Sequence, residues 1–144
     1  MTAKRQQKSW REKLADSKDL PKTMVIPSPA EVDEAMRHVP KGRLATINEI
    51  RACLANKHGT DIACPMTTGI FAWIAAHAAE EGRTAGEKDI MPYWRTLKTG
   101  GELNPKYPGG IPALKKLLAA EGHKVVKKGG RFLVVDLDKK LATL

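Results

Sequence analysis

The feature that most constrains the fold is a run of three predicted helices separated only by short turns, between residues 28 and 82. Ser28-Pro29-Ala30-Glu31 is a capping box with proline at the first helical position, and this helix should end before Pro40. A second cap, at Thr46, begins a helix that ends near Gly59. With a third helix directly after it, this pattern predicts a helix-turn-helix.

The third helix is predicted to begin at Gly69, with Thr67 or Thr68 as its cap, and to end at Gly82. Its many small residues either let it lie close to a DNA backbone in the minor groove or pack it as a buried core helix. Three large apolar side chains are assigned to the core in both interpretations, and a tryptophan is assigned there in preference to base stacking: Ile70, Phe71, Ile74 and Trp73.

A fourth helix has Pro112 in its first turn and is predicted to end at Gly122. The residues that follow flank Lys127-Lys128-Gly129-Gly130, which is typical of a hairpin with a basic tip. The sequence therefore predicts a mainly α fold with a small β hairpin, similar to a winged helix-turn-helix.

The charge balance favours a polyanionic partner. The chain has 25 Lys and Arg against 16 Asp and Glu, a formal net charge of +9, and nucleic acid is a better explanation than colloidal solubility alone. The sequence shows neither a signal peptide nor an apolar run long enough to span a bilayer, so the cytoplasm is the expected location. Cys53 and Cys64 should then stay thiols, and no metal or cofactor is expected, because the histidines have no metal-ligand spacing with them.

A single domain with short terminal extensions is expected for 144 residues. Residues 1–27 form a basic arm, for which a short helix around Trp10–Leu14 that docks on the rest of the chain and a loosely ordered tail are equally good predictions. Residues 28–125 form the winged-helix domain, and residues 126–144 form a C-terminal strand or hairpin extension.

Four sequence blocks stand out in chain order: Val39-Pro40-Lys41-Gly42-Arg43 with Thr46, Pro92-Tyr93-Trp94-Arg95, Tyr107-Pro108-Gly109-Gly110, and Leu117-Leu118-Ala119-Ala120-Glu121-Gly122-His123. Together they resemble the landmarks of the DNA-binding domain of the alkylguanine-DNA alkyltransferases. The resemblance extends from about Ser28 to Val125. Its most specific part is the tyrosine and double glycine followed by a leucine pair before Glu-Gly-His.

The resemblance implies a changed reaction centre. In the family pattern Pro-Cys-His-Arg, a thiolate activated by the histidine takes the alkyl group from a flipped guanine, and a glutamate orients the histidine. Tyr93 stands here in place of the cysteine and Trp94 in place of the histidine, so Glu121 has no imidazole to polarise. A phenol with a pKa of about 10 and no adjacent base is a poor nucleophile at neutral pH, so alkyl transfer is not expected.

The chain thus resembles the alkyltransferase-like branch, whose members lack the cysteine and mark alkylated bases for other repair machinery. This implies a non-enzymatic protein that binds double-stranded DNA through the minor groove, recognises alkylated or distorted bases and works with a repair protein. The lesion pocket would contain Tyr93, Trp94, Arg95 and Tyr107, although internal support by Arg95 and packing of Tyr107 on the fourth helix are alternatives. Two positions depart from the family: Ile47 replaces the tyrosine that helps rotate the nucleotide, and Thr68 or Gly69 replaces the arginine finger.

Eight residues are predicted to contact DNA: Lys41, Arg43, Thr67, Thr68, Gly69, Lys127, Lys128 and Arg131. The Thr67–Gly69 turn would hold a phosphate at a positive helix end, and the basic side chains, with Lys115 and Lys116, would pair with phosphates. Plain N-capping and a solvated charged surface explain these residues equally well.

Two other functions stay open. Cys64 could act as a relocated acceptor or redox thiol, which would make the protein a thiol-dependent enzyme. The helix pair could also belong to a transcription or nucleoid-associated protein that binds DNA without preference for lesions.

Overall fold

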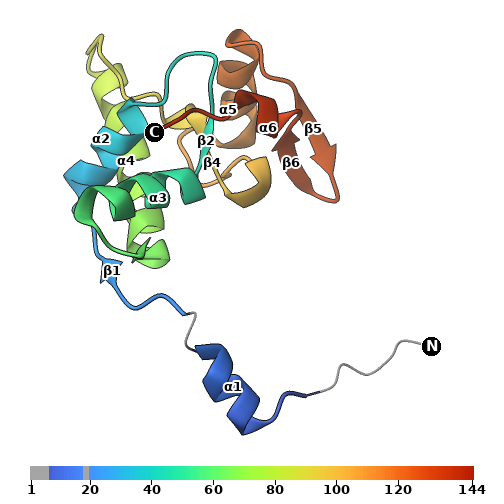
Figure 1. Cartoon of the computed structure of the whole chain (residues 1–144). Helices are drawn as coiled ribbons and strands as arrows, with labels where there is room; N and C mark the ends of the chain where they lie inside the picture. Colours follow the sequence, from blue (N-terminus) through green and yellow to red (C-terminus); the bar gives the residue numbers. More distant parts are fainter. Residues whose placement is uncertain (1–6, 18–19) are drawn as a thin grey trace.

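The computed structural model describes residues 7–17 and 20–144, so Lys4 and Arg5 of the basic arm lie outside the described residues. α1 (Trp10–Asp16) begins at a capping box between Ser9 and Glu12, and none of its residues is buried. The arm therefore contains the predicted helix, but the helix does not dock, and Figure 1 shows it apart from the rest of the chain.

α2 (Pro29–Arg37) and α3 (Ile47–His58) begin and end where the sequence predicts. The hydroxyl of Ser28 accepts from the backbone N–H of Glu31, and that of Thr46 accepts from the second residue of α3. α3 ends at Gly59, whose φ of 65° is a left-handed conformation that glycine adopts without steric cost. Both N-terminal capping signals are therefore confirmed.

α4 (Pro65–Thr84) is longer than predicted at both ends. Proline is favoured as the first residue of a helix, and Pro65 occupies that position, so Thr67-Thr68 lie inside the first turn instead of capping it. The predicted start at Gly69 and end at Gly82 are therefore wrong. The error arose because the prediction took Thr67 or Thr68 as the cap, although Pro65 is also a residue that favours a helix start.

The buried face of α4 consists of small side chains, which are Thr68, Ala72, Ala75, Ala76 and Ala79. This face packs on α2, and small side chains let two helices approach closely. The large side chains take the opposite side, because Ile70, Trp73 and Ile74 are exposed and Phe71 is half-buried. The assignment of Ile70, Trp73 and Ile74 to the core was wrong.

The segment after α4 contains three short elements, η2 (Tyr93–Arg95), β4 (Thr96–Leu97) and η3 (Thr99–Gly101). β4 pairs in parallel with β2 (Ala45–Thr46). A second parallel pair joins β1 (Met24–Val25) to β3 (Ile62–Ala63), which lies in the turn between α3 and α4. These pairings join segments that are far apart in the sequence.

α5 (Gly110–Ala120) has Pro112 in its first turn and is followed by Gly122, as predicted. β5 (Val125–Lys128) and β6 (Arg131–Val134) form the predicted hairpin. α6 (Leu137–Lys140) follows, and the chain then returns to the α2–α3 connection, where the carbonyl of Lys140 accepts from the N–H of Leu44 at 2.8 Å.

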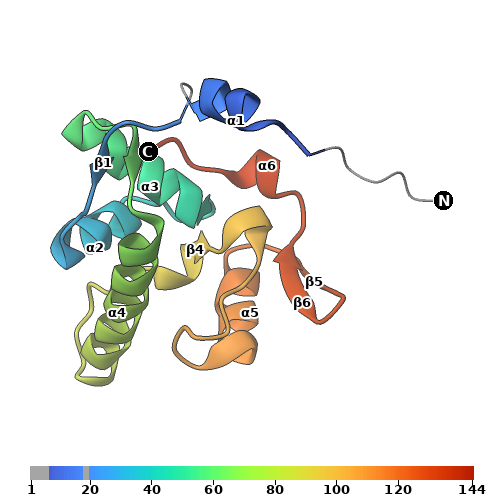
Figure 2. The same cartoon turned by 90° about the horizontal axis from the view of Figure 1, so that it is seen from below.

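The mainly α class with a small hairpin is confirmed. Figures 1 and 2 show α2, α3 and α4 on one side of the molecule and α5 with the β5–β6 hairpin on the other, and β2 and β4 lie between them. In the described ranges, no helix has both the length and the apolar character needed to cross a membrane.

Candidate nucleic-acid interface

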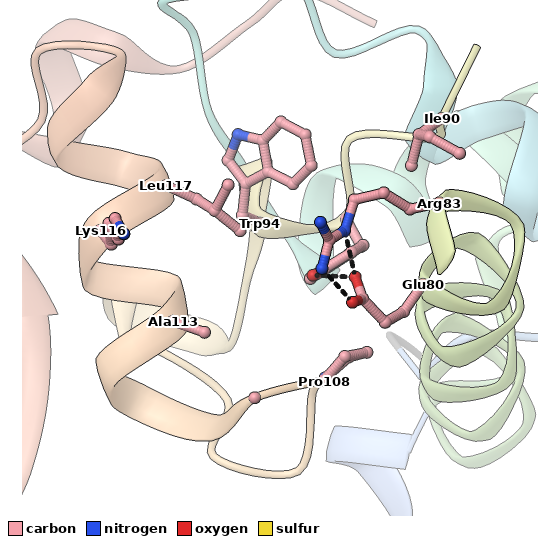
Figure 3. Close-up of a pocket in the computed structure, with 10 residues that line it drawn as sticks. Glu80, Arg83, Ile90, Trp94, Pro108, Ala113, Lys116 and Leu117 are labelled. Atoms are coloured by element: carbon pink, nitrogen blue, oxygen red, sulfur yellow. Dashed lines mark hydrogen bonds and ion pairs between the residues drawn. The ribbon is translucent and has the colours of Figure 1, made fainter. Parts of the chain in front are cut away.

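A cavity of about 440 Å³ lies between the C-terminal half of α4 and α5, beside η2 (Figure 3). This volume is within the usual range of small-ligand sites. Its walls are mainly apolar, and four side chains bring polar groups to it: Glu80, Arg83, Tyr93 and Lys116. Two of the four residues predicted for a lesion pocket, Tyr93 and Trp94, line this cavity.

Tyr93 is only 3% exposed, and its hydroxyl donates to Glu80 Oε2 at 3.2 Å. Burial, together with the negative charge of Glu80, raises the pKa of Tyr93 to about 12. The Arg83 guanidinium pairs with Glu80 and holds the pKa of that carboxyl below its usual value. At neutral pH the phenol is therefore protonated, and its neighbour is a weakly basic carboxylate.

Glu121 joins η2 to α5. Trp94 Nε1 donates to Glu121 Oε2 at 2.8 Å, and Arg95 Nε donates to Glu121 Oε1 at 2.7 Å. Burial alone would raise the pKa of Glu121, but the hydrogen bonds from Arg95 and Trp94 lower it. This carboxylate therefore positions the two residues that follow Tyr93.

Arg95 does not line the cavity. Besides its ion pair with Glu121, it donates to the carbonyl of Val39 at 2.9 Å, and its side chain is 14% exposed. Its predicted place in the lesion pocket is therefore corrected to internal support of the η2 segment, which was the stated alternative.

Tyr107 also lies outside this cavity. Its ring packs edge-on against Tyr93, with 6.2 Å between the ring centroids, and burial raises its pKa. Tyr107 instead lines a second cavity of about 420 Å³, which Gly69, Lys98 and Arg131 also border. Its predicted place in the lesion pocket is corrected to the packing behind Tyr93.

The eight residues predicted to contact DNA are only partly brought together. Gly69 and Arg131 meet at the second cavity. Thr68 is fully buried, and its hydroxyl donates to the carbonyl of Cys64 at 2.7 Å, so it is not available to a phosphate. The prediction for Thr68 was wrong because a threonine in the first turn can satisfy a backbone carbonyl of its own helix.

The other basic candidates are exposed but lie elsewhere. Lys127 and Lys128 lie at the hairpin, and neither borders the second cavity. Arg43 donates to the carbonyl of Lys139 at 3.0 Å, so it is tied to the C-terminal segment, while Lys41 beside it is exposed. Thr67, at the first turn of α4, is half-buried.

Three functional candidates were missed from the sequence: Glu80, Arg83 and Lys98. Residues three apart on a helix share a face, so the first two form a pair that a longer helix would have revealed. The predicted helix end at Gly82 placed Arg83 in a loop. Lys98 had no signal because the short β4 strand before it has no readable pattern.

Cys64 is the cap residue of α4 and is half-buried. The hydroxyl of Thr67 and the first amides of the helix lower the pKa of its thiol. Within the described part of the chain, no three His, Cys, Asp or Glu side chains come together to hold a metal ion.

No protein-family model matches the chain, and no curated protein matches it significantly. Its fold is similar to that of two proteins whose structures have been solved in complex with DNA. Two solved structures carry this likeness: S. pombe Atl1 in complex with damaged DNA containing O6-carboxymethylguanine, and S. pombe ATL in complex with DNA. Each has a TM-score of 0.57 and 18% identity, and each alignment covers 81% of this chain and 94% of the other.

Proposed function

We propose that this protein binds double-stranded DNA without catalysing a reaction and recognises alkylated or distorted bases on behalf of DNA repair. The observation that carries the proposal is the cavity beside Tyr93, in a fold shared with DNA-bound alkyltransferase-like proteins. A flipped base would enter between α4 and α5, where Trp94 and Leu117 offer apolar surface.

The proposal assigns no alkyl transfer to Tyr93. A phenol whose pKa is about 12 is a poor nucleophile at neutral pH, and the neighbouring Glu80 is a weak base because its own pKa is lowered. Tyr93 would instead form the inner wall of the pocket. The same proposal includes contact with DNA through the minor groove, a hairpin that acts as the wing of a winged helix, and a repair protein that acts on the marked site. It also includes a cytoplasmic location, which suits the free thiols Cys53 and Cys64.

The first experiment compares matched duplexes with and without one O6-alkylguanine over a range of salt concentrations. Tighter binding to the modified duplex supports recognition of the lesion. Equal, salt-sensitive binding would leave a DNA-binding protein without lesion preference, and an absence of binding would contradict the proposal. The mass of the protein after incubation should be unchanged, whereas an added alkyl group would point to Cys64 or another acceptor.

A pocket-filling variant locates the lesion site. Ala113→Leu places a larger side chain in the cavity, whereas Ala120→Leu adds the same volume to an exposed position on the same helix. We expect the first variant to lose lesion preference while it keeps its affinity for unmodified duplex, and the second to behave as the parent protein. Equal preference in all three proteins would place the lesion elsewhere.

A further inference from the structure

The solvent face of α4 is apolar over three turns. Met66 is 73% exposed, and Ile70, Trp73 and Ile74 are between 45% and 47% exposed. Because an α-helix has 3.6 residues per turn, these four side chains lie on one stripe, opposite the small residues that pack on α2. We call them the α4 apolar face.

This face is unusual for a helix on the surface of a folded domain. A surface helix normally presents polar side chains to water, and one that is apolar all round is normally covered on all sides. From residue 28 onward, the chain exposes only two other large apolar side chains, Val126 and Leu144. The apolar surface is therefore concentrated where a partner would lie.

The chemistry around the face favours one partner. α4 carries no charged side chain before Glu80. The cavity beside Gly69 is bordered by two cations, Lys98 and Arg131, and by one carboxylate, Glu102, which lies 4.0 Å from each of them, so the border keeps a net positive charge. An uncharged apolar ridge next to basic side chains complements the minor groove, whose walls are deoxyribose and whose rims are phosphate. Several minor-groove proteins insert apolar side chains between base pairs and unstack them.

A second copy of the chain fits less well. Stable interfaces use roughly 20–30 residues on each side, and four side chains on one helix fall far below that number. The α4 apolar face is also held in place at the surface by hydrogen bonds. Trp73 Nε1 donates to the carbonyl of Lys106 at 3.1 Å, and His77 Nε2 lies 3.0 Å from the same oxygen, so the ridge is fixed against the loop before α5.

We propose that the α4 apolar face enters the minor groove and wedges apart one base step, so that the protein prefers duplexes whose stacking is already interrupted. Met66 and Ile70 would supply the wedge, since Thr68 is buried and Gly69 has no side chain. This inference rests on the proposed DNA binding. It adds that the protein recognises DNA in which the stacking of neighbouring bases is lost, in addition to any contact with the altered base in the pocket.

The test uses the full-length protein and two duplexes, one fully paired and one with a single abasic-site analogue, each with 2-aminopurine beside the central position. The parent protein should bind the abasic duplex about tenfold more tightly, because base stacking is already interrupted there, and should raise the 2-aminopurine fluorescence. The test variant is Met66→Gln/Ile70→Gln/Ile74→Gln. Glutamine is a good helix former, and all three positions are exposed, so the fold should be kept.

We expect the triple variant to lose the preference to within about twofold and to lose the fluorescence increase, while its low-salt affinity for paired duplex changes by less than about threefold. Leu144→Gln changes an exposed apolar residue that is not part of the α4 apolar face, and it is the control. An unchanged preference and signal would overturn the proposal. Tighter DNA binding by the triple variant would also overturn it, because this would mean that the N-terminal arm covers the face. A parent protein that is a dimer and becomes a monomer in the triple variant would overturn it as well. If the parent binds no duplex at all, the proposed function itself fails.

Discussion

Tyr93 and Tyr107 are the two tyrosines of the chain, and both rings are buried. The pKa of Tyr93 is raised to about 12, and burial raises that of Tyr107 as well. The absorbance of phenolate should therefore show no step at about pH 10, where the denatured chain titrates. Since the folded state holds these protons more tightly, their contribution to stability is present below pH 10 and is lost as the pH rises toward 12. A full step at pH 10 in the native protein would contradict this burial.

His123 is buried, and neither ring nitrogen has a hydrogen-bond partner among the described residues. Burial, with the nearby charges of Lys140 and Arg95, lowers its pKa, while Glu121 acts in the opposite direction. Below about pH 6.5 the unfolded chain therefore binds a proton that the folded chain does not, and the stability of the fold decreases as the pH is lowered. His123→Leu should reduce this slope by up to about 1.4 kcal/mol per pH unit in urea unfolding at pH 5.5–7.5. The exposed His38→Gln variant should keep the slope, and an equal slope in the parent and the His123 variant would disprove the assignment.

At the level of elements, the start of α5 depends on a glycine that only the structure explains. Gly109 has a φ of 77°, and a Cβ at this position would lie 2.5 Å from Cβ of Ala113. Gly109→Ala should therefore lower the free energy of unfolding by about 1–3 kcal/mol, from both backbone strain and the clash. Gly100→Ala is the matched control, because its φ is 79° and its surroundings are open. Equal losses in thermal unfolding would show that the clash relaxes at no cost.

Glu31 joins two helices. Its carboxylate accepts from the backbone N–H of Ser28 at the start of α2 and contacts His58 and Lys57 at the end of α3. The hydrogen bond from His58, followed by those from Ser28 and Lys57, lowers the pKa of Glu31 to about 2. Its contribution to stability is therefore present above about pH 4.5 and is lost as the pH falls toward 2.

Glu31→Gln keeps an acceptor for the N–H of Ser28 but removes the negative charge that pairs with Lys57 and His58. It should therefore lose up to about 1 kcal/mol at pH 6, and should lose less further stability between pH 4.5 and 2 than the parent. Acid unfolding followed by circular dichroism measures both effects. Glu34→Gln, an exposed carboxylate on the same helix, should follow the parent curve. A similar curve for both variants would mean that Glu31 does not couple the two helices.

The elements that the sequence predicted are those with local signals. The cap at Ser28, the glycine after α3 and the Gly129-Gly130 turn each depend on a few adjacent residues, and all three are observed. Which face of α4 is buried depends on the helix that it packs against, and the sequence of α4 alone does not show this. The alanines pack on α2 and leave Ile70 and Trp73 outside, which reverses the usual rule that large apolar residues are buried.

The candidate site was predictable in part for the same reason. The Pro92-Tyr93-Trp94-Arg95 block located the segment, and the cavity beside Tyr93 and Trp94 is where the resemblance implied a pocket. The opposite wall was not fully predicted, because Arg83 pairs with Glu80 only through the extension of α4 beyond Gly82. Arg95 was ambiguous in sequence, since a buried ion pair and a phosphate contact use the same guanidinium chemistry.

On the scale of the whole molecule, the two ends are attached differently. The arm pairs with the body through Val25, whose strand partner is Ala63, just before α4. The proposed boundary at residue 125 falls at the first residue of β5, and the chain after the hairpin returns to Leu44. The C-terminal segment is thus hydrogen-bonded to the domain. A truncation at residue 125 would remove the residues whose backbone groups form hydrogen bonds with Leu44.

The net charge of +9 gives a final prediction about the orientation of the DNA. Basic residues that contact phosphates release counterions, so the logarithm of the binding constant falls with the logarithm of the salt concentration, by about 0.9 per phosphate. Lys98→Ala and Arg131→Ala, beside the α4 apolar face, should each reduce this slope by about 1. Lys88→Ala removes the same charge from the exposed loop after α4 and should leave the slope unchanged. If all three variants reduce the slope equally, the DNA is attracted by the overall positive field, and the cavity that Lys98 and Arg131 share is not where its backbone lies.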